Sequence, residues 1–72
     1  MVKQEKKVEL KGEVVESLPS ATFKVRLGDE RIVFCHLSGK MRLHHIKVMV
    51  GDQVILEMTP YDEGKGRIIQ RL

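Results

Sequence analysis

Apolar and polar residues alternate strictly along residues 22–27, where polar side chains separate Phe23, Val25 and Leu27. Successive side chains of a β-strand point to opposite faces, so this period of two is typical of a strand half-buried in a core. An amphipathic helix is excluded there, because its apolar residues recur every three to four positions. The pattern therefore restricts the chain to a fold built at least partly from half-buried strands.

Turn residues divide the rest of the chain into further short segments of strand character. We expect strands at residues 8–17, 22–27, 31–37, 53–58 and 67–71. Turns or loops are expected at Leu18-Pro19-Ser20, Gly28-Asp29, Gly51-Asp52 and residues 59–66. Gly12 interrupts the first strand, as glycine does where a barrel strand bends or bulges. Residues 38–50 break the alternation, and Ser38 can cap a short helix over residues 39–43.

The order of elements is therefore three strands, a short helix and two more strands. This order predicts an all-β fold, a five-stranded OB-fold Greek-key barrel with a short helix between strands 3 and 4. The 72 residues are too few for two separate cores, so residues 1–72 are expected to form a single domain. Residues 1–7 are expected to be a flexible N-terminal segment.

Composition excludes several protein classes. Hydrophobic residues make up 42% and charged residues of both signs 32%, which is typical of a folded rather than a disordered chain. Cys35 is the single cysteine, so no disulfide can form within the chain, and a reducing, cytoplasmic setting is favoured. The longest apolar run, residues 32–35, is far too short to span a membrane.

The positive charge is concentrated locally. The net charge is only +3, yet residues 38–50 carry Lys40, Arg42 and Lys47, with His44 and His45, and no acidic residue. Long cationic side chains on a loop and helix can neutralise phosphates, which favours an RNA partner. A solvated basic loop without a partner remains an open alternative.

A second cluster places Tyr61 near Lys65 and Arg67 in the predicted loop between the last two strands. The aromatic ring can stack on a base while the cations hold phosphates. The alternative is a turn whose Tyr61 packs over the end of the barrel. Phe34 and His36 share one face of the third strand, so one or both can face solvent. With few aromatic residues, the chain is better suited to shaped, folded RNA than to generic single strands.

Catalysis is poorly supported by the residues. Cys35 and His36 are neighbours on a predicted strand, so their side chains point to opposite faces and cannot form a nucleophile and base pair. Cys35 is expected to be buried and inert. The spacing of the cysteine and histidines matches no usual zinc pattern, and no glycine-rich nucleotide loop is present. We expect no catalytic residue, no metal site, no cofactor and no enzyme activity.

The segment His36-Leu37-Ser38-Gly39-Lys40-Met41-Arg42 resembles bacterial translation initiation factor one. Further matches follow in family order without a gap: Gly12, Glu16-Ser17-Leu18-Pro19, Phe23-Lys24-Val25, Gly51-Asp52, Thr59-Pro60-Tyr61-Asp62 and Lys65-Gly66-Arg67-Ile68. Each string alone is weak. Their combination is specific, because it spans nearly the whole chain.

The resemblance implies an OB-fold factor that binds the aminoacyl (A) site of the small ribosomal subunit. Members of that family contact the decoding-site RNA and a neighbouring ribosomal protein, block premature tRNA entry and assist the other two initiation factors. For this chain the resemblance implies a cytoplasmic monomer that acts away from membranes. The implied RNA contacts are Lys40, Arg42, Lys47, Lys65 and Arg67. The implied shaping residues are His36, Ser38 and Gly39.

The chain departs from the family pattern after Arg42. The family usually has a basic or polar residue and then an aromatic, whereas this chain has Leu43, His44 and His45. Any stacking there would fall to His45, whose charge can vary near neutral pH, so we expect somewhat weaker and more pH-dependent RNA binding. The usual basic tail is thinned to Arg71-Leu72.

Two other functions are alternatives to this interpretation. Residues 32–36 are similar to an RNA-binding string of cold-shock proteins, so a single-stranded RNA chaperone is the first alternative. The glycine- and phenylalanine-rich motif of those proteins is absent. A small hydrolase that uses Cys35 or the histidines is the second alternative.

Overall fold

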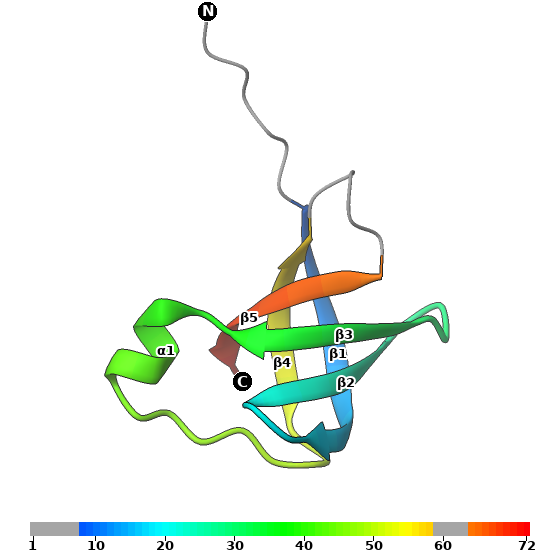
Figure 1. Ribbon diagram of the computed structural model, residues 1–72. Coiled ribbons are helices and arrows are strands. Elements are labelled where there is room, and N and C mark those ends of the chain that lie inside the picture. The colour runs from blue at the N-terminus through cyan, green and yellow to red at the C-terminus, as the bar shows by residue number, and fades with distance from the viewer. Residues whose placement is uncertain (1–7, 59–63) are drawn as a thin grey trace, which may run out of the picture.

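The alternating segments form the strands of a β-barrel in the computed structural model, which describes residues 8–58 and 64–72. In chain order the elements are β1 (Val8–Leu18), β2 (Thr22–Leu27), β3 (Ile32–Leu37), α1 (Gly39–Leu43), β4 (Gln53–Met58) and β5 (Lys65–Arg71) (Figure 1). The predicted bounds of β2, α1 and β4 are confirmed. The N-terminal segment that was predicted to be flexible lies outside the described residues.

The strands close into one barrel in the order β1-β2-β3-β5-β4. Four neighbouring pairs are antiparallel, and β3 pairs with β5 in parallel. Strand β1 closes the barrel because it pairs with β2 on one side and with β4 on the other. This topology confirms the predicted five-stranded OB-fold with a helix between strands 3 and 4.

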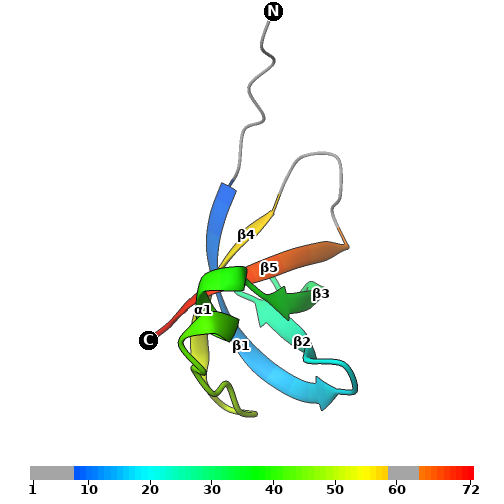
Figure 2. The same ribbon diagram turned by 60° about the vertical axis from the view of Figure 1, so that its left-hand side comes forward.

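The core lies inside the barrel, where the alternating residues of each strand meet. Its buried side chains are Val14, Phe23, Val25, Leu27, Val33, Cys35, Met41, Val48, Val54, Leu56, Met58 and Ile68. Figures 1 and 2 show α1 at the end of the barrel near the C-terminus, and Met41 is the helix residue that enters the core. Among the described residues no helix has the length and apolar character needed to cross a membrane.

The irregularity in β1 lies near Gly12 but not at it. The register with β2 shifts between Val14 and Glu16, so the bulge comes after the glycine. Gly12 itself pairs with Leu27 on one side and with Val54 on the other. A Cβ atom at this position would lie 2.4 Å from Val25 Cγ1. The glycine is therefore required by the close approach of β2.

The last strand begins earlier than predicted. Lys65 and Gly66 fall within the predicted loop of residues 59–66, but both belong to β5. They pair in parallel with Phe34 and Cys35 of β3, a contact between segments far apart in the sequence. Gly66 suits this place because a Cβ there would lie 2.9 Å from Leu56 Cδ1. Local turn propensity was therefore overridden by pairing and packing. Residues 59–63 of the predicted loop lie outside the described residues.

Candidate nucleic-acid interface

The short helix α1 is fixed to the barrel at its first turn. Ser38 caps the helix, since its Oγ accepts a hydrogen bond of 3.2 Å from the Met41 N–H. The Ser38 N–H donates to the carbonyl of Ile68 in β5 at 2.9 Å. Met41 is buried in the core. These contacts hold the helix in place and leave its other side chains at the surface.

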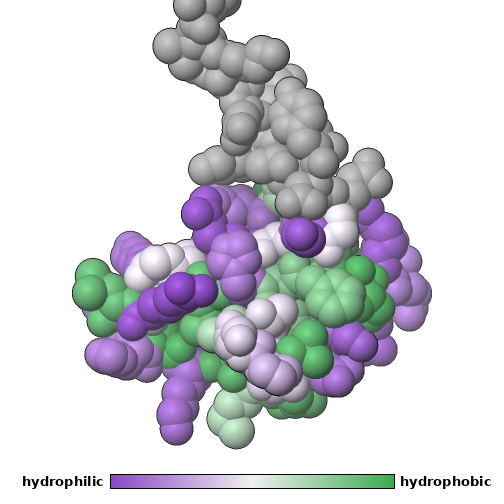
Figure 3. All heavy atoms as spheres, in the orientation of Figure 1, coloured by the Kyte–Doolittle hydropathy of each residue, from purple (hydrophilic) through white to green (hydrophobic). Residues whose placement is uncertain are grey.

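The cations predicted to contact RNA on this segment all face solvent. Lys40, Arg42 and Lys47 are exposed, and so is His45. Figure 3 shows hydrophilic side chains projecting over α1, at the left of the molecule. His45 has a φ of 54° and closes the helix, its N–H donating to the Arg42 carbonyl at 3.2 Å. No acidic residue lies between Ser38 and Gly51, so no carboxylate of this segment offsets the positive charge.

The connection after the helix is tied to the end of β5. Arg71 Nη1 donates to the carbonyl oxygen of Lys47 at 3.0 Å, while the Lys47 side chain stays exposed. Val48 is buried next to it. Before Lys47, the Ile46 N–H donates to the Met41 carbonyl at 3.0 Å, so the backbone is anchored on both sides of the residue. Gly39 is exposed, and a Cβ there would meet no atom within 4 Å, so internal packing does not require this glycine.

A second group of predicted residues lies on the outer face of β2, β3 and β5. His36 of β3 pairs with Thr22 of β2 and with Arg67 of β5. The neighbouring outward row joins Lys24, Phe34 and Lys65 across the same three strands. His36 and Lys65 are exposed, as is the ring of Phe34. The register thus places three of the predicted site residues on one face.

Among the residues predicted to contact RNA, Arg67 is the one whose side chain is held by an ion pair within the described part of the protein. Its Nη2 donates to Glu57 Oε1 of β4, and the two side chains form an ion pair. The Nε of Arg67 is buried without a hydrogen-bond partner among the described residues. Arg67 is only half-buried, so part of the guanidinium faces the outer side of the sheet. Its position is set by Glu57, which also offsets part of its charge.

Several cations elsewhere on the barrel are paired with carboxylates. Three surface ion pairs join Lys24 to Glu16, Arg26 to Glu13 and Arg31 to Asp29. In contrast, within residues 8–58 and 64–72 no ion pair involves Lys40, Arg42, Lys47 or Lys65. The cations of α1 and its connection are therefore available to an anionic partner, although the net charge of the chain is small.

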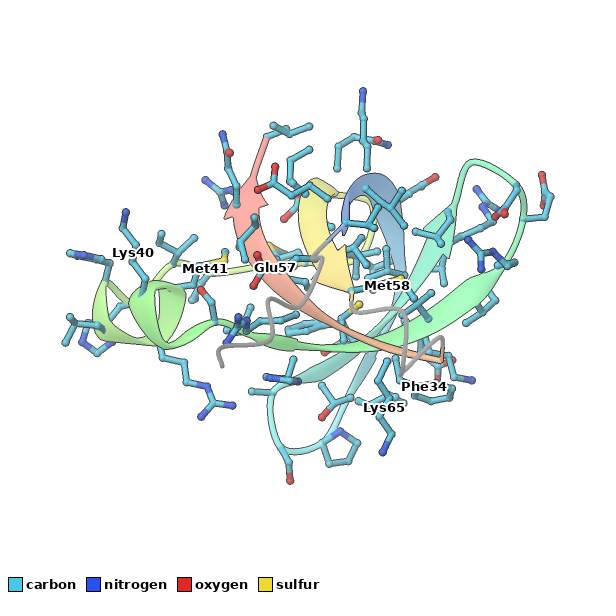
Figure 4. The ribbon with its side chains drawn as sticks, turned by 90° about the horizontal axis from the view of Figure 1, so that it is seen from above. Phe34, Lys40, Met41, Glu57, Met58 and Lys65 are labelled. Atoms are coloured by element: carbon cyan, nitrogen blue, oxygen red, sulfur yellow. The ribbon has the colours of Figure 1, made fainter. Side chains whose placement is uncertain are left out.

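The structure thus divides the predicted site into two parts. One lies at the end of the barrel and contains Ser38, Gly39, Lys40, Arg42, His45 and Lys47; the other lies on the strand face and contains His36, Lys65 and Arg67. Figure 4 shows Lys40 at the helix end of the molecule, away from Lys65. Tyr61 lies outside the described residues, so its stacking role stays a prediction.

Phe34 and Lys24 were not among the predicted site residues, although they complete the strand face. The signal that locates them is the period of two. It puts Phe34 on the same side of β3 as His36, and Lys24 opposite the buried Phe23 of β2. Composition alone does not indicate the row of Lys24, Phe34 and Lys65, because these residues become neighbours only through the pairing of three strands.

Cys35 has the properties of a core residue. Its side chain is buried on the same face of β3 as Val33, whereas His36 is exposed on the other face. The prediction that the cysteine and histidine point to opposite faces is therefore confirmed. Burial raises the pKa of the Cys35 thiol to about 12, and the Gly66 backbone hydrogen bond offsets this only in part. In the described part of the chain, no group of three or more histidine, cysteine or acidic residues is placed to hold a metal ion.

We expect Cys35 to resist alkylation in the native protein. At pH 8 a thiol with a pKa of about 12 has roughly a thousandfold less thiolate than an ordinary one, and burial blocks the reagent as well. The rate of iodoacetamide labelling, followed by mass spectrometry, checks this. The same protein unfolded in urea at the same pH is the control. Native labelling as fast as in urea would contradict the assignment.

Comparisons with known proteins agree with this geometry. The chain matches the family described as translation initiation factor 1A / IF-1 over residues 1–72. It is similar to the solution structure of translation initiation factor one from the Wolbachia endosymbiont strain TRS of Brugia malayi. The TM-score is 0.78 and the identity 46%, over 92% of this chain and 78% of that one. It is also similar to YjeQ from Thermotoga maritima, with a TM-score of 0.71 and 35% identity over 90% of this chain but 23% of YjeQ. The second likeness therefore concerns one part of a larger protein.

Proposed function

Since the chain belongs to the translation initiation factor 1A / IF-1 family, we propose that it binds the A site of the small ribosomal subunit during initiation. There it contacts decoding-site RNA and a neighbouring ribosomal protein. By occupying the site it blocks premature entry of tRNA, and it assists the other two initiation factors. The role is binding rather than catalysis, carried out in the cytoplasm by one domain acting as a monomer.

The observation that carries the proposal is the cationic end of the barrel. Lys40, Arg42 and Lys47 project from a segment without carboxylates, on a backbone anchored by Ser38 and Met41. A fixed scaffold lowers the entropy that must be lost when the side chains order on RNA. Each cation that neutralises a phosphate releases counterions and makes the affinity depend on salt.

The strand face supplies the second part of the contact. His36, Lys65 and Arg67 lie close together on the paired strands β3 and β5. Arg67 is positioned by Glu57, so it presents its guanidinium in one orientation. Together the two parts suit a folded RNA, because they present cations on differently oriented surfaces of a rigid barrel.

Replacing Arg42 by alanine is expected to weaken binding to isolated small ribosomal subunits roughly tenfold, because one phosphate contact is lost. The slope of log affinity against log salt should fall by about 1. Thermal stability should stay nearly constant, since the side chain is exposed and makes no ion pair among the described residues. Fluorescence anisotropy of labelled protein across a salt series measures the affinity and its salt dependence, and thermal unfolding measures the stability.

The matched control is Arg26→Ala. Arg26 is also an exposed arginine, but it lies on β2 in an ion pair with Glu13. Its removal should leave subunit affinity within about twofold of the wild type, since it makes no contact in the proposed interface. Equal losses for the two variants would remove the specific role of Arg42. A large loss of stability in Arg42→Ala would show that the residue is structural.

A further inference from the structure

Phe34 is an aromatic residue that the fold leaves at the surface. It is 46% exposed, whereas Phe23 is 6% exposed in the core. Its position in β3 turns the ring outward, because Val33 and Cys35 on either side of it point inward. Single exposed apolar residues are common on proteins, so exposure alone indicates no function.

The neighbours of Phe34 make the position distinctive. Strand register places Lys24 of β2 on one side of it and Lys65 of β5 on the other. Adjacent strands lie about 4.8 Å apart, so two flexible lysines flank the ring within a side-chain length. Figure 4 shows Phe34 and Lys65 on the same side of the barrel, away from Lys40. In Figure 3 a hydrophobic area with hydrophilic side chains beside it lies over the right-hand half of β3.

The two lysines make only weak contacts within the protein, so their ammonium groups can leave these contacts and bind a ligand. Lys24 Nζ lies 5.6 Å from the centroid of the Phe34 ring, near the outer limit for a cation–π contact. The same Nζ is 3.2 Å from Glu16 Oε1, in a surface ion pair of the kind that contributes little to stability. Lys65 is exposed and has no ion pair among the described residues. Both ammonium groups can therefore move to a phosphate.

We propose that Phe34 is a stacking platform for an unpaired RNA base, and that Lys24 and Lys65 hold the phosphates on either side of that base. An aromatic face accepts any base, and adjacent cations hold the backbone without regard to sequence. A hydrophobic protein surface would fit less well, because burying it here would desolvate two ammonium groups, of which only that of Lys24 has a carboxylate partner in the described part of the chain. The site shares Lys65 with the proposed ribosomal contact, but it is centred on Phe34 and requires no ribosome, so it goes beyond the proposed function.

The direct test uses Phe34→Trp. The chain has no tryptophan, so the indole is the sole fluorophore excited at long wavelength, and its emission reports on position 34. The variant is titrated with a hexamer of uridylate and with a hexamer of abasic ribose phosphates of the same charge. We expect saturable quenching by the first oligomer and little by the second, since only the first has bases to stack. Equal quenching by both, or no binding of the uridylate hexamer, would overturn the proposal.

Affinity measurements on alanine variants test the ring independently of the reporter. Phe34→Ala should bind the labelled uridylate hexamer roughly tenfold more weakly than the wild type. Ile32→Ala is the matched control, because Ile32 is a 44% exposed apolar residue on the same face of β3. It should bind like the wild type. Equal losses in the two variants would overturn the stacking role.

Removing the flanking cations separates the two parts of the proposed contact. Lys24→Ala with Lys65→Ala should lower the salt dependence of hexamer binding while tryptophan quenching by saturating hexamer persists. An unchanged salt dependence would overturn the role of the lysines. Failure of the wild type to bind small subunits would count against the proposed function alone, since the hexamer assays contain no ribosome.

Discussion

Replacing Phe23 by alanine is expected to lower the free energy of unfolding by about 3–5 kcal/mol, because a large side chain is removed from a closed core. Phe23 is 6% exposed and lies on β2 beside Cys35 of β3. The barrel is closed on all sides, so neighbouring strands cannot collapse into the space. A chain of this size rarely has more than about 3–5 kcal/mol of total stability, so the variant should be largely unfolded at 25 °C.

Urea denaturation followed by circular dichroism measures this loss. Phe34→Ala is the matched control, because it is the same substitution at a 46% exposed ring and should cost at most about 1 kcal/mol. Phe23→Leu retains most of the buried volume and should give an intermediate loss that can be fitted. A midpoint for Phe23→Ala near that of Phe34→Ala would contradict the assignment of Phe23 to the core.

Gly12→Ala is expected to destabilise the barrel by about 1–3 kcal/mol, although alanine usually suits a strand better than glycine. The added Cβ would lie 2.4 Å from Val25 Cγ1 and 3.0 Å from the backbone oxygen of Arg26. Val25 is fully buried and the oxygen belongs to β2, so neither atom can move without disturbing the sheet. The smaller conformational entropy of unfolded alanine offsets only part of this cost.

The control for Gly12 is Gly28→Ala, measured by the same urea denaturation. A Cβ at Gly28 would meet no atom within 4 Å, so this variant should match or slightly exceed the stability of the wild type. The pair therefore separates crowding from the general effect of replacing glycine. Equal stabilities of the two variants would show that β1 and β2 do not approach closely at Gly12.

The strands were predictable where each one carries its own signal. β2 alternates cleanly between apolar and polar residues, and β4 follows the Gly51-Asp52 turn with Val54, Leu56 and Met58 on one face. The start of β5 was not predictable, because Lys65 and Gly66 are turn-forming residues locally and become a strand only by pairing with β3. The bulge between Val14 and Glu16 was not predictable either, because the sequence indicates a bend or bulge only through Gly12 and does not give the register.

The candidate site was predictable to a similar extent. The basic segment with Lys40 and Arg42 is continuous in the sequence, so its charge can be read directly. The pairing of Arg67 with Glu57 joins two strands and has no local signature. The same holds for the row of Phe34 between two lysines, because three strands contribute to it. Contacts across strands are set by register, which the sequence alone did not determine.

The most direct test of the central claim compares two RNA partners in one buffer across a salt series. The full chain is titrated with isolated small ribosomal subunits and, separately, with an unstructured RNA oligomer. Binding to a cationic surface shaped for folded RNA predicts saturable, one-to-one binding to the subunit and clearly weaker binding to the oligomer. Equal affinity for both would contradict the proposed initiation role and favour a single-stranded RNA chaperone, and no saturable binding to the subunit would contradict the proposed role outright.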